Sequence, residues 1–320
     1  MRTMRIEALG QDLAMAEVAL PAPGPGEVLL RVHACGLNFA DTLMLAGRYQ
    51  EKPALPFAPG IEVCGTVAAL GPGVAAPPEG LRVVSLCGSG GLAEYVVVPA
   101  AGCAPVPEGM SDEVAAGFLV AYGTSHIALA ELARLRPGET LLVTGAAGGV
   151  GLTAVEIGSL LGARVLAVAR GAEKRAAATA AGARETFDAG EEFAAAVKAL
   201  GGADVVYETV GGAVFDRCLR AARPGARLLP IGFAGGEVPQ IPANRLLVKN
   251  QTVIGFYFGA WIRRHPQAAR RSLEALMAWH RMGRISPHVS HVLPLEAANE
   301  GLRLIATRAA TGKLVVRVAR

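Results

Sequence analysis

The sequence predicts an α/β protein in which a doubly wound parallel sheet interrupts a β-rich, barrel-like domain. Three observations support this fold class. Residues 1–115 consist mainly of short apolar strands between Gly- and Pro-rich turns, which is typical of barrel-like β domains. From 116 to 258, short apolar strands alternate with helical segments, which favours a parallel sheet. Residues 141–151 read as a buried strand, a glycine turn and a helix start.

The β-rich domain begins with a turn-rich segment, Pro21–Gly26, and continues with strands expected at 28–35, 63–70, 82–86 and 93–98. Near the end of the chain, strands expected at 289–293 and 313–318 surround a last helix at 295–308. We expect these elements to rejoin the first domain. The predicted domains are therefore 1–115 with 259–320, and 116–258 inserted between them.

The inserted domain is expected to contain a complete dinucleotide-binding sheet. Helices separate most of its strands, and a long helix at 266–282 follows the last of them. The strands are expected at 139–144, 164–169, 185–187, 204–208, 226–231 and 252–257.

The glycine turn predicts a site for a dinucleotide pyrophosphate. Gly148 lets the backbone approach the phosphates, and Gly151 permits close packing of helix on strand. Ala146 replaces the first glycine of the usual fingerprint, which is tolerable if the turn keeps a negative φ there. The helix N-terminus directs backbone amides at the negative charge. The residues expected to contact the cofactor here are Ala147, Gly148, Gly149, Val150 and Gly151.

Two cations follow the second strand and indicate NADPH. Arg170 lies about 19 residues past Gly151, where an NAD site usually has Asp or Glu bonded to the ribose 2′-hydroxyl. A carboxylate there would repel a 2′-phosphate, whereas Arg170 and Lys174 would attract one. The alternative is that both are ordinary surface charges.

Two later strand ends are also expected to touch the cofactor, because ligands of such sheets bind at the carboxyl ends of the strands. Val210 and Gly211 follow the fourth strand, and Ile231, Gly232 and Phe233 follow the fifth. The alternative is that these are ordinary turn residues.

Composition and charge exclude several functions. The chain has 320 residues, 52% of them apolar, which is enough for two domains and a large core. Its net charge of +4 is scattered, so we expect no nucleic-acid partner. No apolar run reaches the length of a membrane span, and the N-terminus lacks a signal pattern, so we expect no membrane association and a cytoplasmic location.

The cysteine count predicts no metal cluster. The five cysteines never form a C-x-x-C pair, and in a reducing compartment they are expected to be small buried side chains. Cys35 and Cys64 flank the expected pocket and are the candidates for a reactive thiol.

Several segments carry a family resemblance: Pro23–Val28, Ala34–Asp41, Pro56–Gly65, Asp204–Gly212 and Thr311–Val316. Through them the chain resembles the medium-chain dehydrogenase/reductase superfamily from end to end. It is most similar to the zinc-free quinone oxidoreductases, the branch related to zeta-crystallin. The resemblance implies a Rossmann domain inserted into a GroES-like catalytic domain, an NADPH-dependent quinone reductase activity and a homodimer.

The same comparison predicts that no metal is bound. Zinc alcohol dehydrogenases carry Cys-His where this chain has Asn38-Phe39, and Gly-His-Glu where it has Gly60-Ile61-Glu62. One thiolate and one imidazole ligand are missing, and Glu62 alone cannot hold zinc. The absence of a Lewis acid favours an acceptor that takes hydride easily, such as a quinone or an enone.

The resemblance also implies further site residues. Asn38 and Tyr49 would line the substrate cleft, with Tyr49 or water supplying a proton. Asp41 is the retained acidic residue of that motif, and the alternative for it is a helix cap. The remaining residues expected near the cofactor are Thr124, Phe256, Phe258 and Lys313. Phe256 and Phe258 are expected to end the sixth strand, as a cofactor lid or as part of a dimer core.

Two departures from the branch concern the cofactor. Arg170-Gly171 stands where many members have serines, and Phe187-Asp188-Ala189 stands where they often have a Tyr. Asp188 would weaken phosphate binding if it pointed inward.

Two other functions remain open. An enoyl-thioester reductase would share the chemistry and fold but need a wide cleft and cations for the CoA phosphates. The other is a non-catalytic NADPH-binding protein, like a lens crystallin or an RNA-binding relative. RNA binding would need aromatic residues interleaved with a basic stripe, which the sequence lacks.

Overall fold

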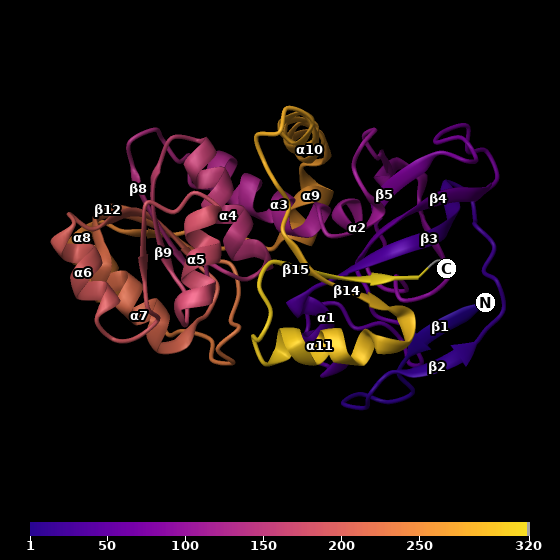
Figure 1. Ribbon diagram of the computed structural model, residues 1–320, viewed down its shortest axis with the longest axis horizontal. Helices are drawn as coiled ribbons and strands as arrows, with labels where there is room; N and C mark the ends of the chain where they lie inside the picture. Colours follow the sequence, from indigo (N-terminus) through magenta and orange to yellow (C-terminus); the bar gives the residue numbers. More distant parts are fainter. Residues whose placement is uncertain (319–320) are drawn as a thin grey trace. The chain divides into compact units, whose positions relative to one another are not determined.

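The computed structural model describes residues 1–318, which form two compact units. Unit 1 comprises residues 1–119 and the chain from 287 onward, and unit 2 comprises 120–286. The chain therefore leaves unit 1 once and returns to it (Figure 1). Within the described residues, no helix has both the length and the apolar character needed to cross a membrane.

Unit 1 is organised around the long strand β3 (Glu27–Leu37), whose alternating apolar side chains are buried in the core. It pairs antiparallel with β4 (Glu62–Leu70), β6 (Tyr95–Pro99) and the C-terminal strand β15 (Lys313–Arg317). The sheet runs in the order β14-β15-β3-β4-β5-β7, with β6 also on β3. The remaining strands of this unit are β14 (Val289–Pro294), β5 (Arg82–Leu86), β7 (Ala104–Pro105) and the separate hairpin β1 (Arg2–Arg5) and β2 (Ala14–Glu17).

Short helices cover this sheet. The helix α2 (Asp112–Ala116) begins at Ser111, whose side chain accepts a hydrogen bond from Val114 N. It packs across β3 and β4 so closely that a Cβ on Gly36 would lie 2.3 Å from the Ala116 carbonyl oxygen. The other helical segments of unit 1 are α1 (Phe39–Leu45), α11 (Ala298–Ala306), and the 3-10 turns η1 (Ala100–Gly102) and η3 (Leu295–Ala297).

Unit 2 contains a six-stranded, fully parallel sheet in the order β10-β9-β8-β11-β12-β13. In chain order this is 3-2-1-4-5-6, the order of the dinucleotide-binding fold, so the predicted doubly wound sheet is confirmed. The strands are β8 (Thr140–Thr144), β9 (Arg164–Val168), β10 (Glu185–Phe187), β11 (Ala203–Glu208), β12 (Ala222–Pro230) and β13 (Thr252–Val253).

Helices cover both faces of the parallel sheet. The helix α4 (Gly149–Leu160) lies against one face, because a Cβ on Gly158 would be 2.4 Å from Leu141 and 3.2 Å from Val165. Their chain neighbours Leu142 and Leu166 point the other way. On that second face they share one core cluster with side chains of α6 (Phe193–Ala199) and α7 (Gly212–Ala221).

The division at the end of unit 2 differs from the predicted boundary after residue 258. Residues 259–286 belong to unit 2, because α10 (Pro266–Arg281) packs on α3 (Leu119–His126). His126 Nδ1 lies 2.8 Å from Ser272 Oγ, and the His126 and Trp279 rings meet edge to face at 5.2 Å. The remaining helices are the π-helix η2 (Ile127–Leu132), α5 (Ala172–Ala180), α8 (Ala243–Lys249) and α9 (Phe258–Arg264).

The predicted extent of the sixth strand is wrong. Strand β13 ends at Val253, and Phe258 already begins α9. β13 is an edge strand that pairs with β12 through two residues only. Gly255 disfavours a longer strand, because glycine has no side chain to pack on the sheet. Phe256 and Phe258 therefore lie beyond the strand.

Candidate functional site

The glycine turn after β8 has the geometry of a phosphate-binding loop. Gly145 has a φ of +58°, and a Cβ there would lie 2.2 Å from Thr209 Oγ1. A Cβ on Gly151 would lie 2.2 Å from the Gly145 carbonyl oxygen, so close packing requires glycine at both positions. Ala146 is buried and is not among the residues with positive φ, as its side chain requires.

Gly148 is different, because the protein itself does not require glycine there. Its φ is −78°, and an added Cβ would meet only the Gly145 carbonyl oxygen, at an ordinary 3.4 Å. Gly148 is the N-cap of α4, so the amides of Gly149, Val150 and Gly151 have no partner within the helix. Open space beside backbone amides at a helix N-terminus fits a diphosphate.

A buried network led by Glu208 fixes the neighbouring turn. The Glu208 carboxylate accepts hydrogen bonds from Val210 N (2.7 Å), Gly211 N (2.9 Å) and Thr144 Oγ1 (2.9 Å). Thr209 Oγ1 donates to the Thr144 carbonyl at 2.9 Å. Burial raises the pKa of Glu208, and these hydrogen bonds oppose the rise. Glu208 was not predicted as a site residue. The signal that could have identified it is an acidic residue at the end of an apolar strand.

The turns after β11 and β12 lie against each other. Ile231 N donates to the Glu208 carbonyl at 2.7 Å, and a Cβ on Gly211 would lie 3.2 Å from the Phe233 ring. Because β8, β11 and β12 are adjacent and parallel, their carboxyl ends share one edge of the sheet. The structure thus brings together most of the residues predicted from the sequence to hold the cofactor, namely Ala147, Gly148, Gly149, Val150, Gly151, Val210, Gly211, Ile231, Gly232 and Phe233.

The turn after β9 carries the two predicted phosphate-binding cations. Arg170 is exposed, and Lys174 is half-buried in the first turn of α5. Beside them, Asp188 Oδ2 accepts hydrogen bonds from Gly171 N at 3.1 Å and from Arg175 at 2.5 Å. Asp188 therefore places a carboxylate at the N-terminus of α5, with Arg175 as its cationic partner.

Aromatic side chains gather next to Thr124. Thr124 is buried in α3, and a Cβ on the preceding Gly123 would lie 2.9 Å from the Phe258 ring. Phe256 meets the rings of Phe258 and Trp261 edge to face, each at 6.4 Å between centroids. These contacts place Phe256 and Phe258 in one cluster on α3 within unit 2.

In unit 1, Lys313 is the centre of a buried polar cluster. Its ammonium donates to the Leu37 carbonyl (2.8 Å), Asn38 Oδ1 (2.8 Å) and Glu62 Oε1 (2.7 Å). The Lys313 and Glu62 side chains are 8% and 1% exposed. Lys313, which was predicted as a cofactor contact, thus uses its three N–H groups inside unit 1.

The predicted catalytic residues adjoin this cluster to different degrees. Asn38 Nδ2 donates to Glu62 Oε1 (2.9 Å) and the Gly36 carbonyl (3.2 Å), so both amide hydrogens are engaged within unit 1. Asp41 accepts hydrogen bonds from Asn38 N (2.8 Å) and Gly60 N (2.9 Å). Burial raises the pKa of Asp41 to about 6, while these backbone hydrogen bonds oppose the rise.

These contacts favour a structural role for Asp41 as the cap of α1. Tyr49 is half-buried and packs against the apolar core of unit 1. The two thiols considered as reactive, Cys35 and Cys64, are buried, and burial raises the pKa of both well above the usual value. This keeps them as thiols rather than nucleophilic thiolates.

Comparison with known proteins gives a consistent family. The family model of the alcohol dehydrogenase GroES-like domain matches residues 24–108. The family model of the zinc-binding dehydrogenases matches residues 149–276. The chain is 41% identical to a quinone oxidoreductase-like protein 2 homolog of Nematostella vectensis, over 98% of this chain and 88% of that protein.

Two solved structures share the whole fold. The quinone oxidoreductase of Thermus thermophilus, solved alone and with NADPH, has a TM-score of 0.88 and 38% identity, over 99% of this chain and 100% of that one. A mycobacterial protein in complex with NADPH has a TM-score of 0.94 and 32% identity, over 99% of this chain and 100% of that one.

Proposed function

We propose that this protein, which belongs to the quinone oxidoreductase-like group of the medium-chain dehydrogenase/reductase superfamily, is an NADPH-dependent reductase of quinones or enones that works without zinc. The observation that carries the proposal is Gly148. It is a glycine that neither backbone geometry nor packing requires, at the start of a helix whose first amides are available to a diphosphate.

NADPH rather than NADH is supported by charge. Arg170 and Lys174 follow β9, where a carboxylate would select the free ribose hydroxyl. The NADPH complexes of the relatives from Thermus and from a mycobacterium agree with this assignment. When bound, NADPH supplies a hydride.

The absence of zinc from the reaction is supported by Lys313. Its ammonium is bonded to Glu62 and to Asn38, the residue found at a ligand position of the zinc dehydrogenases. A divalent cation between these side chains would have to displace the ammonium, or it would be repelled by the ammonium charge. The Lys313 ammonium therefore supplies the positive charge of this cluster, in the place that a metal ion would need.

We assign proton supply to Tyr49 or to water, because the family resemblance places Tyr49 in the substrate cleft. Both carboxylate oxygens of Asp41 accept backbone amides, and both amide hydrogens of Asn38 are donated within unit 1. We propose that Asn38 and Asp41 are positioning residues that hold the loop around α1, while Tyr49 donates a hydrogen bond or proton to the acceptor oxygen.

We also propose a cytoplasmic homodimer. The five cysteines are free, which suits a reducing compartment. The strand β13 is the edge of its sheet, and Leu247 and Val248 on the neighbouring helix α8 are 78% and 75% exposed. An apolar surface next to an open sheet edge is suited to a second copy of the chain. Light scattering on the purified protein tests this, and a monomer at micromolar concentration contradicts it.

The function is tested by following NADPH absorbance in chelator-treated protein with a panel of quinones, enones and enoyl-CoA thioesters. We expect turnover of quinones or enones without added metal, and a reduced turnover number in Tyr49→Phe. Turnover of none of the panel overturns the reductase proposal. Turnover confined to the thioesters indicates an enoyl-thioester reductase, and activity restored only by zinc contradicts the metal-free assignment.

A further inference from the structure

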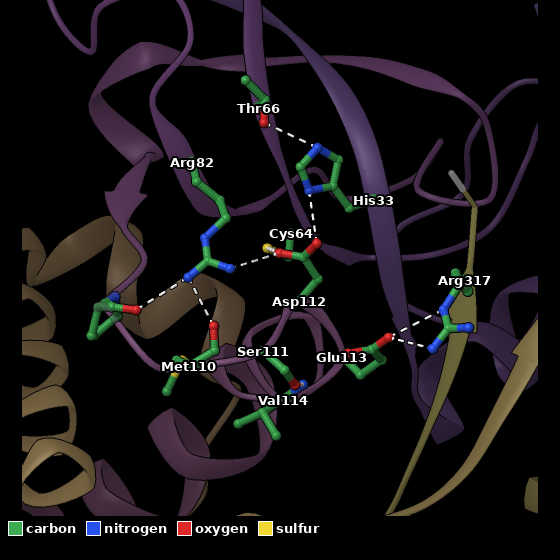
Figure 2. A network of polar contacts seen from close by, with 11 residues as sticks. His33, Cys64, Thr66, Arg82, Met110, Ser111, Asp112, Glu113, Val114 and Arg317 are labelled. Carbon is green, nitrogen blue, oxygen red and sulfur yellow. Dashed lines mark hydrogen bonds and ion pairs between the residues drawn. The ribbon is translucent and has the colours of Figure 1, made fainter. Parts of the chain in front are cut away.

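A second polar cluster in unit 1 brings together three side chains of the kinds that bind metals (Figure 2). His33 on β3, Cys64 on β4 and Asp112 at the start of α2 each offer one ligand atom, and these atoms lie within 4.8 Å of one another. His33 Nδ1 is 2.9 Å from Asp112 Oδ2, and Cys64 Sγ is 3.4 Å from Asp112 Oδ1. None of the three residues takes part in the reaction proposed above.

We propose that His33, Cys64 and Asp112 form a binding site for a thiophilic divalent cation of the zinc class, with water as the fourth ligand. Thiolate, imidazole and carboxylate are the side chains that zinc prefers. Tetrahedral coordination at normal zinc bond lengths places such ligand atoms about 3.3–3.6 Å apart. His33 Nδ1 is 2.9 Å from Asp112 Oδ2 and Cys64 Sγ is 3.4 Å from Asp112 Oδ1, so small side-chain movements would bring one atom of each residue to these separations.

The surrounding contacts orient the ligands as outer partners do in metal sites. Thr66 Oγ1 lies 3.0 Å from His33 Nε2, on the far side of the ring from Asp112. Arg82 donates to Asp112 Oδ1 at 3.1 Å and is itself anchored on the Met110 carbonyl at 2.8 Å. The Asp112 carboxylate lies between His33 and Arg82 (Figure 2), with Oδ2 toward His33 and Oδ1 toward Cys64 and Arg82.

The protons and charges of this binding step balance. The cation forms a bond to Cys64 Sγ, and the thiol proton leaves to solvent. The neutral His33 ring frees Nδ1 for the cation by carrying its proton on Nε2, where the Thr66 hydroxyl accepts it. The thiolate and the carboxylate carry two negative charges, which balance the dication once the Arg82 guanidinium leaves Asp112 Oδ1 and keeps its hydrogen bonds to the Pro107 and Met110 carbonyls. Because the thiol proton is released on binding, the affinity should increase with pH.

The site is reachable and would link three elements. The His33 and Asp112 side chains are 17% and 31% exposed, so a cation can enter beside them, whereas Cys64 is buried beneath. A cation held there would join β3, β4 and α2. Because binding to the folded state alone raises stability, the metal should raise the melting temperature of the protein.

The test uses the full chain after chelator treatment, with Zn²⁺ and Co²⁺ as probes. In the wild type we expect one equivalent of Co²⁺ to produce a thiolate-to-cobalt charge-transfer absorption, and Zn²⁺ to bleach it and raise the melting temperature. Cys64→Ser should lose the absorption and weaken Zn²⁺ binding at least about tenfold. Cys103→Ser, which removes a partly exposed thiol elsewhere in unit 1, should behave like the wild type.

Two further variants guard against a folding defect. His33→Gln should weaken Zn²⁺ binding while leaving the circular dichroism spectrum intact, and Thr66→Val should weaken it about tenfold because it removes an outer partner. A cobalt spectrum without a thiolate band, or Zn²⁺ binding that is equal in wild type and His33→Gln, shows that the cluster is a hydrogen-bond network only and overturns the proposal.

Discussion

Lys313 places its ammonium nitrogen 2.7 Å from Glu62 Oε1, although the two residues are 251 positions apart in the sequence. Both side chains are almost completely buried, and Asn38 bonds to both of them. A charge held in such surroundings depends on its partner, because neither group can be hydrated. The stability of unit 1 therefore depends on the pair as a whole.

Lys313→Met should lower the free energy of unfolding by about 3–5 kcal/mol, because it leaves the Glu62 carboxylate buried without a cation. The double variant Lys313→Met/Glu62→Gln should recover part of this loss, because it removes the stranded charge. Urea unfolding followed by circular dichroism measures both. Arg270→Met, which breaks an exposed pair with Glu274, serves as the control and should change little. A double variant no more stable than the single one would falsify this account of the pair.

Gly148→Ala should weaken NADPH binding, whereas Gly151→Ala should lower the stability of the protein. At Gly148 a methyl group fits the protein, so stability should be retained while the added group obstructs the pyrophosphate and weakens NADPH binding. At Gly151 the methyl group would lie 2.2 Å from the Gly145 carbonyl, so the protein itself should lose stability. Thermal unfolding without cofactor and fluorescence titration with NADPH separate the two. Unchanged NADPH affinity in Gly148→Ala contradicts the proposed position of the diphosphate.

Arg170→Asp should raise the Michaelis constant for NADPH by about tenfold or more and spare that for NADH, since it removes a charge-assisted contact to the 2′-phosphate. Steady-state kinetics with the two cofactors provide the measurement. Arg170→Lys keeps the charge and should lose much less. If both cofactors respond equally to Arg170→Asp, the phosphate role is wrong.

Asp188→Asn should act in the opposite direction. It removes the carboxylate that lies beside Gly171 and releases Arg175 from its ion pair, so more positive charge faces the 2′-phosphate. We expect a lower Michaelis constant for NADPH and little change for NADH, in the same assay. A higher constant would indicate that Asp188 is needed to hold the turn after β9.

Asp41 should make stability depend on pH between about pH 4 and pH 6. Its pKa is about 6 in the folded protein, because burial disfavours the carboxylate, so the folded state binds more protons than the unfolded state in that range. The stabilising contribution is complete below about pH 4 and is lost as the pH rises through about 6, by about 3 kcal/mol.

The comparison that isolates this effect is wild type against Asp41→Asn, by urea unfolding at several pH values. The variant does not titrate at this position and is neutral at every pH, as protonated Asp41 is below about pH 4. The wild type should therefore lose stability relative to Asp41→Asn as the pH rises from about 4 to about 6. A difference independent of pH would mean that Asp41 does not titrate in this range.

The parts of the fold that depend on local patterns were predictable from the sequence. The glycine turn at 145–151 and the alternation of strands and helices identify the parallel sheet, because each signal lies within a few turns of chain. The end of β13 was missed, since an apolar run such as 252–257 does not reveal that the strand has only one neighbour. The helix α10 was placed in the wrong unit, because an amphipathic pattern does not identify the surface that it covers.

The candidate site also has a part that was predictable from the sequence and a part that was not. The residues that line the diphosphate turn follow from strand ends and could be read in order along the chain. The partner of Glu62 could not, because β15 is brought to β3 only by folding of the whole unit. Asn38 was expected to offer its amide to a substrate, and its engagement with Glu62 and Gly36 depends on that same long-range pairing.

The discontinuity of unit 1 has a consequence for biosynthesis. Unit 2 is a single segment, 120–286, that can fold as soon as it leaves the ribosome. Unit 1 must wait, because β15 and its Lys313 are translated only after the whole of unit 2. Until then a nascent chain has an unpaired edge on β3, and Glu62 lacks the ammonium of Lys313. A premature stop shortly before residue 313 should therefore yield a target for proteolysis rather than a shortened enzyme.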